Sequence, residues 1–184
     1  MRELIEKRTA RSKTWDLENG KFATQVGGGI AHHQKNGAWV DTDSNWTDLT
    51  DRFGVGEFPF AIDFRKNTRT LTIDYGGGDV LTLTPRNMEV PTSITRSGNG
   101  ITLVRLWKGI TLKLILTPEG LHFNYIKTST SFINPSFNVT GDWEKYYGTN
   151  IYEANGIPVT MPQTLVSGKL TYDFSLVPLN VEVR

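Results

Sequence analysis

Apolar and polar residues alternate with a period of two along much of the chain. Residues 70–75 and 80–84 alternate in this way on either side of a Gly-rich stretch, and between residues 111 and 117 three leucines fall on one face. Side chains of a β-strand point to opposite faces in turn, so this pattern predicts strands of a sheet that is buried on one side.

The most regular region is residues 92–128, where short apolar runs are separated by turn sequences rich in Gly, Asn and Pro. These turn residues favour tight reversals of the chain. The region therefore predicts a meander of about four strands, which we expect to supply the core: Ser93–Arg96, Ile101–Trp107, Ile110–Leu116 and Leu121–Lys127.

Two β-hairpins are predicted nearer the N-terminus, each around an Asn-Gly pair that tolerates the positive φ angles of a type I′ turn. The first joins Thr14–Glu18 to Lys21–Val26, and the second joins Ile30–Gln34 to Ala38–Asp41. Between them, Gly27-Gly28-Gly29 predicts a bend or a close backbone approach. No helix-forming segment follows these glycines, which argues against a phosphate-binding loop.

No long amphipathic helix is apparent, and glycines and prolines break residues 129–163 into short pieces. We therefore predict an all-β fold, an antiparallel β-sandwich or jelly-roll-like arrangement of about ten to twelve short strands with little helix. Residues 1–13 are dense in charge and are predicted to form an N-terminal arm before a single domain at 14–184. The arm is either solvated, as a coil or short helix, or docked on an acidic neighbour.

The composition and net charge limit the classes of binding partner and the kinds of site that the chain can have. The 184 residues are 38% hydrophobic and 21% charged, enough apolar material for one core, and the net charge of +1 selects neither nucleic acid nor an anionic membrane. There is no cysteine, which excludes disulfides and thiolate metal sites. The N-terminal residues are charged where a signal peptide is apolar, so we expect a protein that stays in the cell that makes it or leaves by a route that needs no signal, such as lysis.

Candidate chemistry is sparse. His32 and His33 are adjacent on a predicted strand and so point to opposite faces, which prevents both from binding one metal. Asp41–Asn45 begins like a calcium loop, but Trp46 replaces the required Gly and Arg52 the required Glu, which leaves an Asx-rich turn or a looser cation site. No nucleophile motif is present, and scattered carboxylates alone identify no glycosidase. We expect no enzyme activity, metal or cofactor.

Aromatic residues divide into two groups. Trp39 and Trp107 lie within strand patterns and are expected in the core, whereas the aromatics between 142 and 152 lie in an irregular, charged stretch and are expected at an interface or stacked on a sugar. With the basic residues of the arm, the predicted binding residues are Arg2, Lys7, Arg8, Arg11, Trp143, Tyr146, Tyr147 and Tyr152.

The runs SKTWDLENGKF (12–22) and IAHHQKNGAWVDTD (30–43) resemble the β-rich module that opens many large bacterial surface proteins with YD (RHS-type) repeats, and residues 58–128 fit that style loosely. The resemblance implies a β-rich fold and transfers no catalytic residue. Those proteins are usually secreted and very long. A stand-alone version without a signal peptide would suit a phage virion, so we expect a capsid decoration or tail protein that binds other virion proteins and forms a homo-oligomer. The alternatives are a carbohydrate-binding module and an RHS-associated surface domain.

Overall fold

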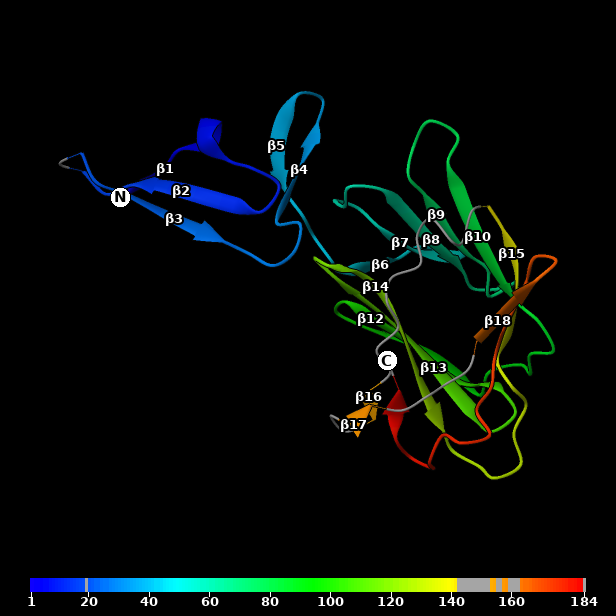
Figure 1. The fold of residues 1–184 in the computed structure, drawn as a ribbon. Coiled ribbons are helices and arrows are strands. Elements are labelled where there is room, and N and C mark those ends of the chain that lie inside the picture. Colours follow the sequence, from blue (N-terminus) through cyan, green and yellow to red (C-terminus); the bar gives the residue numbers. More distant parts are fainter. Residues whose placement is uncertain (19, 142–152, 155–156, 159–162, 184) are drawn as a thin grey trace.

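The structure is a computed structural model that describes residues 1–18, 20–141, 153–154, 157–158 and 163–183. In these residues the regular structure is twenty strands, β1 to β20, and one 3-10 helix, η1 (Ile5–Lys7). All strand pairs are antiparallel. Two large sheets face each other and two small ones lie N-terminal to them (Figure 1). The predicted all-β, sandwich-like fold is confirmed.

The first large sheet has eight strands, and the five strands on one side of it, from the edge strand β6 to β10, form a meander. The chain then leaves for the other sheet and returns with β15, which pairs with β10. In spatial order the strands are β18 (Gln163–Val166), β19 (Lys169–Tyr172), β15 (Ser136–Thr140), β10 (Val80–Pro85), β9 (Leu71–Asp74), β8 (Ala61–Arg65), β7 (Arg52–Val55) and β6 (Trp46–Asp48).

The second large sheet has seven strands and contains the predicted meander, each strand of which ends within one residue of its predicted bounds. In spatial order the strands are β11 (Ser93–Ser97), β12 (Gly100–Trp107), β13 (Ile110–Thr117), β14 (Gly120–Lys127), β20 (Glu182–Val183), β16 (Glu153–Ala154) and β17 (Ile157–Pro158). The total of twenty strands exceeds the ten to twelve predicted. Five of the twenty have only two or three residues, which is too short to show an alternation of apolar and polar residues.

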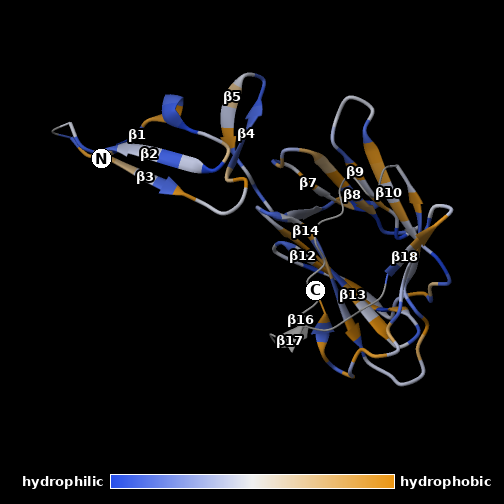
Figure 2. Cartoon of the chain, in the orientation of Figure 1, coloured by the Kyte–Doolittle hydropathy of each residue, from blue (hydrophilic) through white to orange (hydrophobic). Residues whose placement is uncertain are grey.

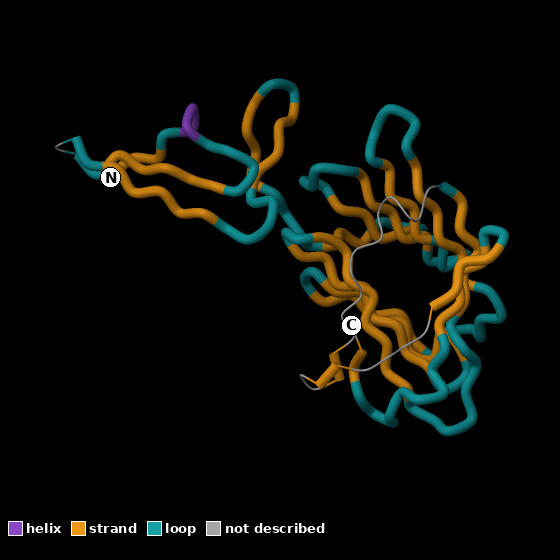
Figure 3. The backbone as a smooth tube through the Cα atoms, viewed as in Figure 1, coloured by secondary structure: helices purple, strands orange, loops and turns teal. Residues whose placement is uncertain are grey.

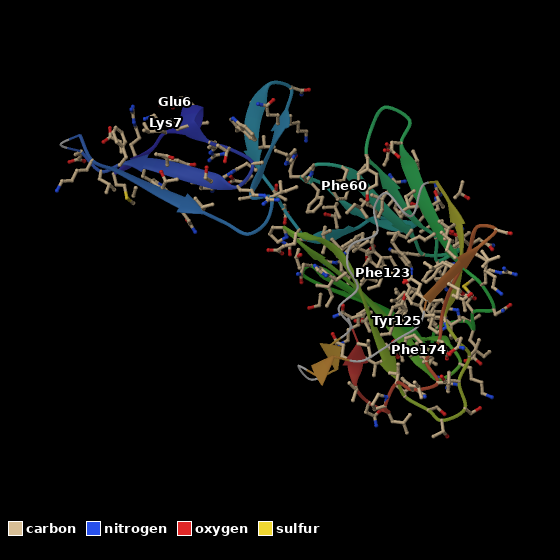
Figure 4. The ribbon with its side chains drawn as sticks, viewed as in Figure 1. Glu6, Lys7, Phe60, Phe123, Tyr125 and Phe174 are labelled. Carbon is tan, nitrogen blue, oxygen red and sulfur yellow. The ribbon has the colours of Figure 1, made fainter. Side chains whose placement is uncertain are left out.

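Aromatic side chains from the two sheets meet in the core. The Phe137 ring of β15 lies 5.3 Å from the Trp107 ring of β12 and 6.1 Å from the Phe123 ring of β14. Tyr125 of β14 lies 5.3 Å from Tyr172 of β19. Figure 4 shows Phe123 and Tyr125 in the region between the sheets, and hydrophobic residues are concentrated on the large sheets in Figure 2. Each buried aromatic removes about 150–250 Å² from water, so these rings dominate the stability of the sandwich.

A β-bulge in β12 lets two consecutive large side chains enter the core. The pairing of β12 with β13 is interrupted between Leu103 and Trp107, where Arg105 has a φ of 58° and its N–H donates to Thr111 Oγ1. Leu106 and Trp107 are both fully buried as a result. The expectation that Trp107 belongs to the core is confirmed. Trp39 is half-buried and lies outside this core.

The N-terminal residues form a three-stranded sheet of β1 (Arg2–Glu3), β2 (Ser12–Asp16) and β3 (Phe22–Val26), followed by the hairpin of β4 (His32–Lys35) and β5 (Ala38–Asp41). The structure differs from the predicted arm, since the boundary after residue 13 falls inside β2. The arm is held because its backbone pairs: the Leu4 N–H donates to the Thr14 carbonyl at 2.8 Å, and Leu4 is buried.

Both predicted hairpins are present. In the β4–β5 turn, Asn36 has a φ of 53° and Gly37 a φ of 78°, the conformation expected of a type I′ turn. The N-terminal sheet and this hairpin project from one end of the sandwich (Figure 3).

The N-terminal unit joins the sandwich at Gly29, where a Cβ would lie 2.6 Å from the Pro118 backbone in the turn between β13 and β14. The Ile30 N–H donates to the Pro118 carbonyl at 2.9 Å. Glu57 makes a second connection, since its carboxylate accepts a bond from Lys35 Nζ at 2.6 Å. The close backbone approach predicted for residues 27–29 is therefore confirmed.

Candidate functional site

A cluster of charged side chains connects the three-stranded sheet to the β4–β5 hairpin. The Arg8 guanidinium donates to both carboxylate oxygens of Glu3, from Nε at 2.7 Å and from Nη2 at 3.0 Å. Its Nη1 lies 3.2 Å from Asp41 Oδ1, and Lys13 Nζ lies 3.3 Å from the same oxygen. Arg8 is thus engaged within the chain, with 10% of its side chain exposed. Among the predicted binding residues that the structure describes, Arg8 forms ion pairs with carboxylates of the chain itself.

The carboxylates of this cluster have lowered pKa values. The hydrogen bond from Arg8 is the largest cause for Glu3. For Asp41, burial raises the pKa, but the hydrogen bond and charge of Lys13 and the charges of Arg8 and His32 together outweigh it and lower the pKa. Both carboxylates are therefore held in the ionised form that the cations require.

The two adjacent histidines point apart, as predicted. His32 is fully buried, with Nδ1 3.0 Å from the Thr9 carbonyl oxygen and Nε2 3.3 Å from Asp41 Oδ1. His33 lies near Glu57, at 3.8 Å between Nε2 and Oε2. In the part of the chain that the structure describes, no group of three or more His, Asp or Glu side chains is arranged to hold a metal ion.

The Asp-rich segment after β5 forms an Asx turn, because Asp43 Oδ1 accepts hydrogen bonds from the backbone N–H of Asn45 at 2.9 Å and from its side-chain amide at 2.7 Å. Asp41, which would have been the first ligand of a calcium loop, faces the basic cluster instead. The turn interpretation of this segment is confirmed.

The remaining basic residues of the N-terminal segment, Arg2, Lys7 and Arg11, are exposed. Lys7 Nζ lies 4.3 Å from the centre of the Phe22 ring, a cation–π contact on the surface of the sheet (Figure 4 labels Lys7). Apolar side chains are exposed beside them, with 55% of Phe22 and 72% of Val26 accessible. Basic and apolar groups thus share one small projecting sheet.

Trp143, Tyr146, Tyr147 and Tyr152, the predicted aromatic binding residues, lie outside the described residues.

A shallow aromatic pocket, which the sequence did not predict, lies in the eight-stranded sheet where β7 and β9 end and β8 begins. Its volume is about 350 Å³, and its lining includes Val55, Phe58, Pro59, Phe60, Asp74 and Tyr75. The Phe60 ring lies 4.9 Å from the Phe58 ring, almost perpendicular to it, and 4.8 Å from the Tyr75 ring. The run Phe58-Pro59-Phe60 was visible in the sequence, but its proximity to Tyr75 arises from the pairing of β8 with β9.

A scan of this sequence against models of known families gives no match, and comparisons with curated proteins and with solved structures find no match either. Among the described residues, no helix is long and apolar enough to cross a membrane.

Proposed function

We propose that the chain is a non-enzymatic structural protein of a bacteriophage particle, a capsid decoration or tail component that acts by binding neighbouring proteins. The observation that carries the proposal is the projecting N-terminal sheet, which exposes apolar side chains beside cations. Exposed groups of this kind mark interaction surfaces in soluble proteins. The resemblance of residues 12–43 to a module of large surface proteins supports a role in assembly.

In this role the sandwich is a rigid support and the N-terminal sheet makes the contact. Burial of Phe22 and Val26 against a neighbour would supply the apolar part of the interface, and Arg2, Lys7 and Arg11 would pair with carboxylates at its rim. The internal pairing of Arg8 with Glu3 keeps the sheet folded before it binds, which reduces the entropy lost on association.

The first test is mass spectrometry of purified particles of the phage whose genome encodes the chain. The chain should be present in a fixed number of copies per particle, and its absence from washed particles would refute the proposal.

The second test is co-sedimentation of the purified chain with particles that lack it. The triple variant Arg2→Ala, Lys7→Ala, Arg11→Ala should bind less, whereas a matched triple variant at exposed cations of the sandwich should bind normally: Arg65→Ala, Lys108→Ala and Lys169→Ala.

The aromatic pocket favours a second candidate function, the binding of a carbohydrate. Half-buried Phe60 and Tyr75 offer ring faces for stacking, and Asp74 offers a carboxylate that could accept bonds from sugar hydroxyls. Calorimetric titration with a panel of oligosaccharides tests this function. Heat of binding that is lost in Tyr75→Ala and retained in the control Tyr172→Phe would support it, and no heat with any member of the panel would refute it.

A further inference from the structure

The strand β3 has an open edge. In the described part of the chain it pairs only with β2, and no strand lies along its other side (Figure 1). The Gly27 N–H donates to the Arg11 carbonyl at 2.8 Å, and the Leu17 N–H to the Lys21 carbonyl at 2.9 Å. Since hydrogen-bonded and non-hydrogen-bonded pairs alternate in an antiparallel ladder, Ala23 and Gln25 use their backbone groups toward β2.

The same alternation directs the N–H and C=O groups of Phe22, Thr24 and Val26 to the open edge. A side-chain contact agrees with this assignment: Thr24 Oγ1 lies 3.1 Å from Thr14 Oγ1, and side chains come closest in pairs that are not hydrogen-bonded to each other. Within the part of the chain that the structure describes, the edge therefore presents three unpaired donors and three unpaired acceptors in a regular row.

This edge lacks the features by which β-proteins usually protect such rows. Residues 22–26 (FATQV) contain no charge and no proline, and their pairing with β2 has no bulge. Two other edges differ from it: β1 has only two residues, and at β6 the Trp46 N–H donates to the Gly98 carbonyl while Arg96 Nη1 donates to the Trp46 carbonyl. An unprotected edge with exposed Phe22 and Val26 is suited to pairing with another strand.

The sequence of β3 is complementary to itself. If two copies meet antiparallel with Thr24 opposite the partner subunit's Thr24, Phe22 faces the partner's Val26 twice. In this register the outward-directed N–H and C=O groups of one copy lie opposite those of the other. Each of the three residue pairs exchanges two hydrogen bonds, which gives about six hydrogen bonds between the chains. Thr–Thr and aromatic–β-branched pairs are favourable across strands, and no like charges meet.

We propose that two copies of the chain associate through β3 in this register, which would join their N-terminal sheets into one continuous sheet. The inference deepens the proposed assembly function and rests on it for its biological role, since it names a second copy of the chain as the partner at the projecting sheet. The pairing is isologous and therefore closes as a two-fold symmetric dimer.

Sedimentation velocity of the full chain over a range of concentrations should show a dimer, twice the monomer mass. Val26→Lys places an ammonium group against the partner's Phe22, whose ring is already in contact with the ammonium group of the partner's Lys7, at 4.3 Å. The repulsion between the two like charges should leave a monomer. Val90→Lys, the same change at a valine that is 85% exposed on the sandwich, should leave the dimer intact. The double variant Phe22→Glu, Val26→Lys sets opposite charges across both pairs and should restore the dimer.

Crosslinking tests the position of the two-fold axis, because the chain has no cysteine of its own. Thr24→Cys should give a covalent dimer with a short bis-maleimide, and Val90→Cys should not. Circular dichroism confirms that each variant is folded. A monomer at all concentrations without crosslinking would overturn the inference, and so would a dimer that Val26→Lys does not weaken.

The two proposals can fail separately. A chain that is present in particles but stays monomeric and is not crosslinked by Thr24→Cys would refute pairing through β3 and leave the assembly function standing. A dimer formed through β3 by a chain that is absent from particles would refute the virion function and leave the pairing standing.

Discussion

Replacing Trp46 tests how the two large sheets are closed at one edge. Trp46 begins β6, the outermost strand of the eight-stranded sheet, and only 1% of it is exposed. Its indole N–H donates to the Asn99 carbonyl at 3.0 Å, and its backbone N–H to the Gly98 carbonyl at 3.1 Å, both in the β11–β12 turn of the opposite sheet. Trp46→Phe removes the first of these bonds and keeps the second.

The magnitude follows from two contributions. The lost hydrogen bond costs about 1 kcal/mol net, near the lower end for a buried group, because the Asn99 carbonyl keeps a second bond from the Leu116 N–H at 2.9 Å. The smaller ring removes roughly one or two methylene equivalents at about 0.8 kcal/mol each. Trp46→Phe should therefore lower the free energy of unfolding by about 2 kcal/mol. In a chain of this size that lowers Tm by about 4–8 °C.

Urea unfolding followed by far-ultraviolet circular dichroism measures this change without relying on tryptophan fluorescence. Trp39→Phe is the matched control, since Trp39 is half-buried in the β4–β5 hairpin and should lose well under 1 kcal/mol. If the two variants lose the same free energy of unfolding, the contacts of Trp46 with the opposite sheet do not stabilise the fold and the reasoning is wrong.

Three further predictions concern the N-terminal unit. Gly29→Ala places a Cβ 2.6 Å from Pro118 and should cost about 1–3 kcal/mol in urea unfolding. Gly28→Ala meets its nearest neighbour at 3.7 Å and should be near neutral, so equal losses would contradict the close approach. Because the pKa of Asp41 is lowered, its ion pairs stabilise the fold above pH 3.8 and lose this effect as the pH falls through the lowered pKa. Tm in acid should therefore fall less in Asp41→Asn than in the native chain; parallel curves would argue against the pairing. Gly37→Ala, at a φ of 78°, should cost roughly 1 kcal/mol in the same assay, and an unchanged midpoint would exclude strain in that turn.

Much of the local structure was predictable because it depends on near neighbours. The meander at residues 93–127 was predicted to within one residue per strand, since alternating leucines and Gly-containing turns act over a few positions. The turn at Asn36-Gly37 was predictable for the same reason. The division into two facing sheets depended on distant pairings, such as that of β10 with β15, which leave no trace in local periodicity.

The candidate sites show the same division. The opposite directions of His32 and His33 followed from strand geometry alone. The internal pairing of Arg8 did not, since it needs Glu3 of β1 and Asp41 of β5, two strands that are far apart in the sequence. The aromatic pocket likewise required the pairing that brings Tyr75 beside Phe60. Charge density at residues 1–13 predicted an arm, whereas backbone pairing with β2 makes the segment part of a sheet.

The sequence by itself determined the all-β class, the positions of the best-patterned strands and turns, and the opposite directions of adjacent side chains, because each depends on the two-residue period of a strand or on turn chemistry. Only the tertiary structure decided which strands neighbour one another, which charges are neutralised internally, and that β3 is left with an open edge. Those properties depend on contacts between residues far apart in the chain, and local sequence does not encode their partners.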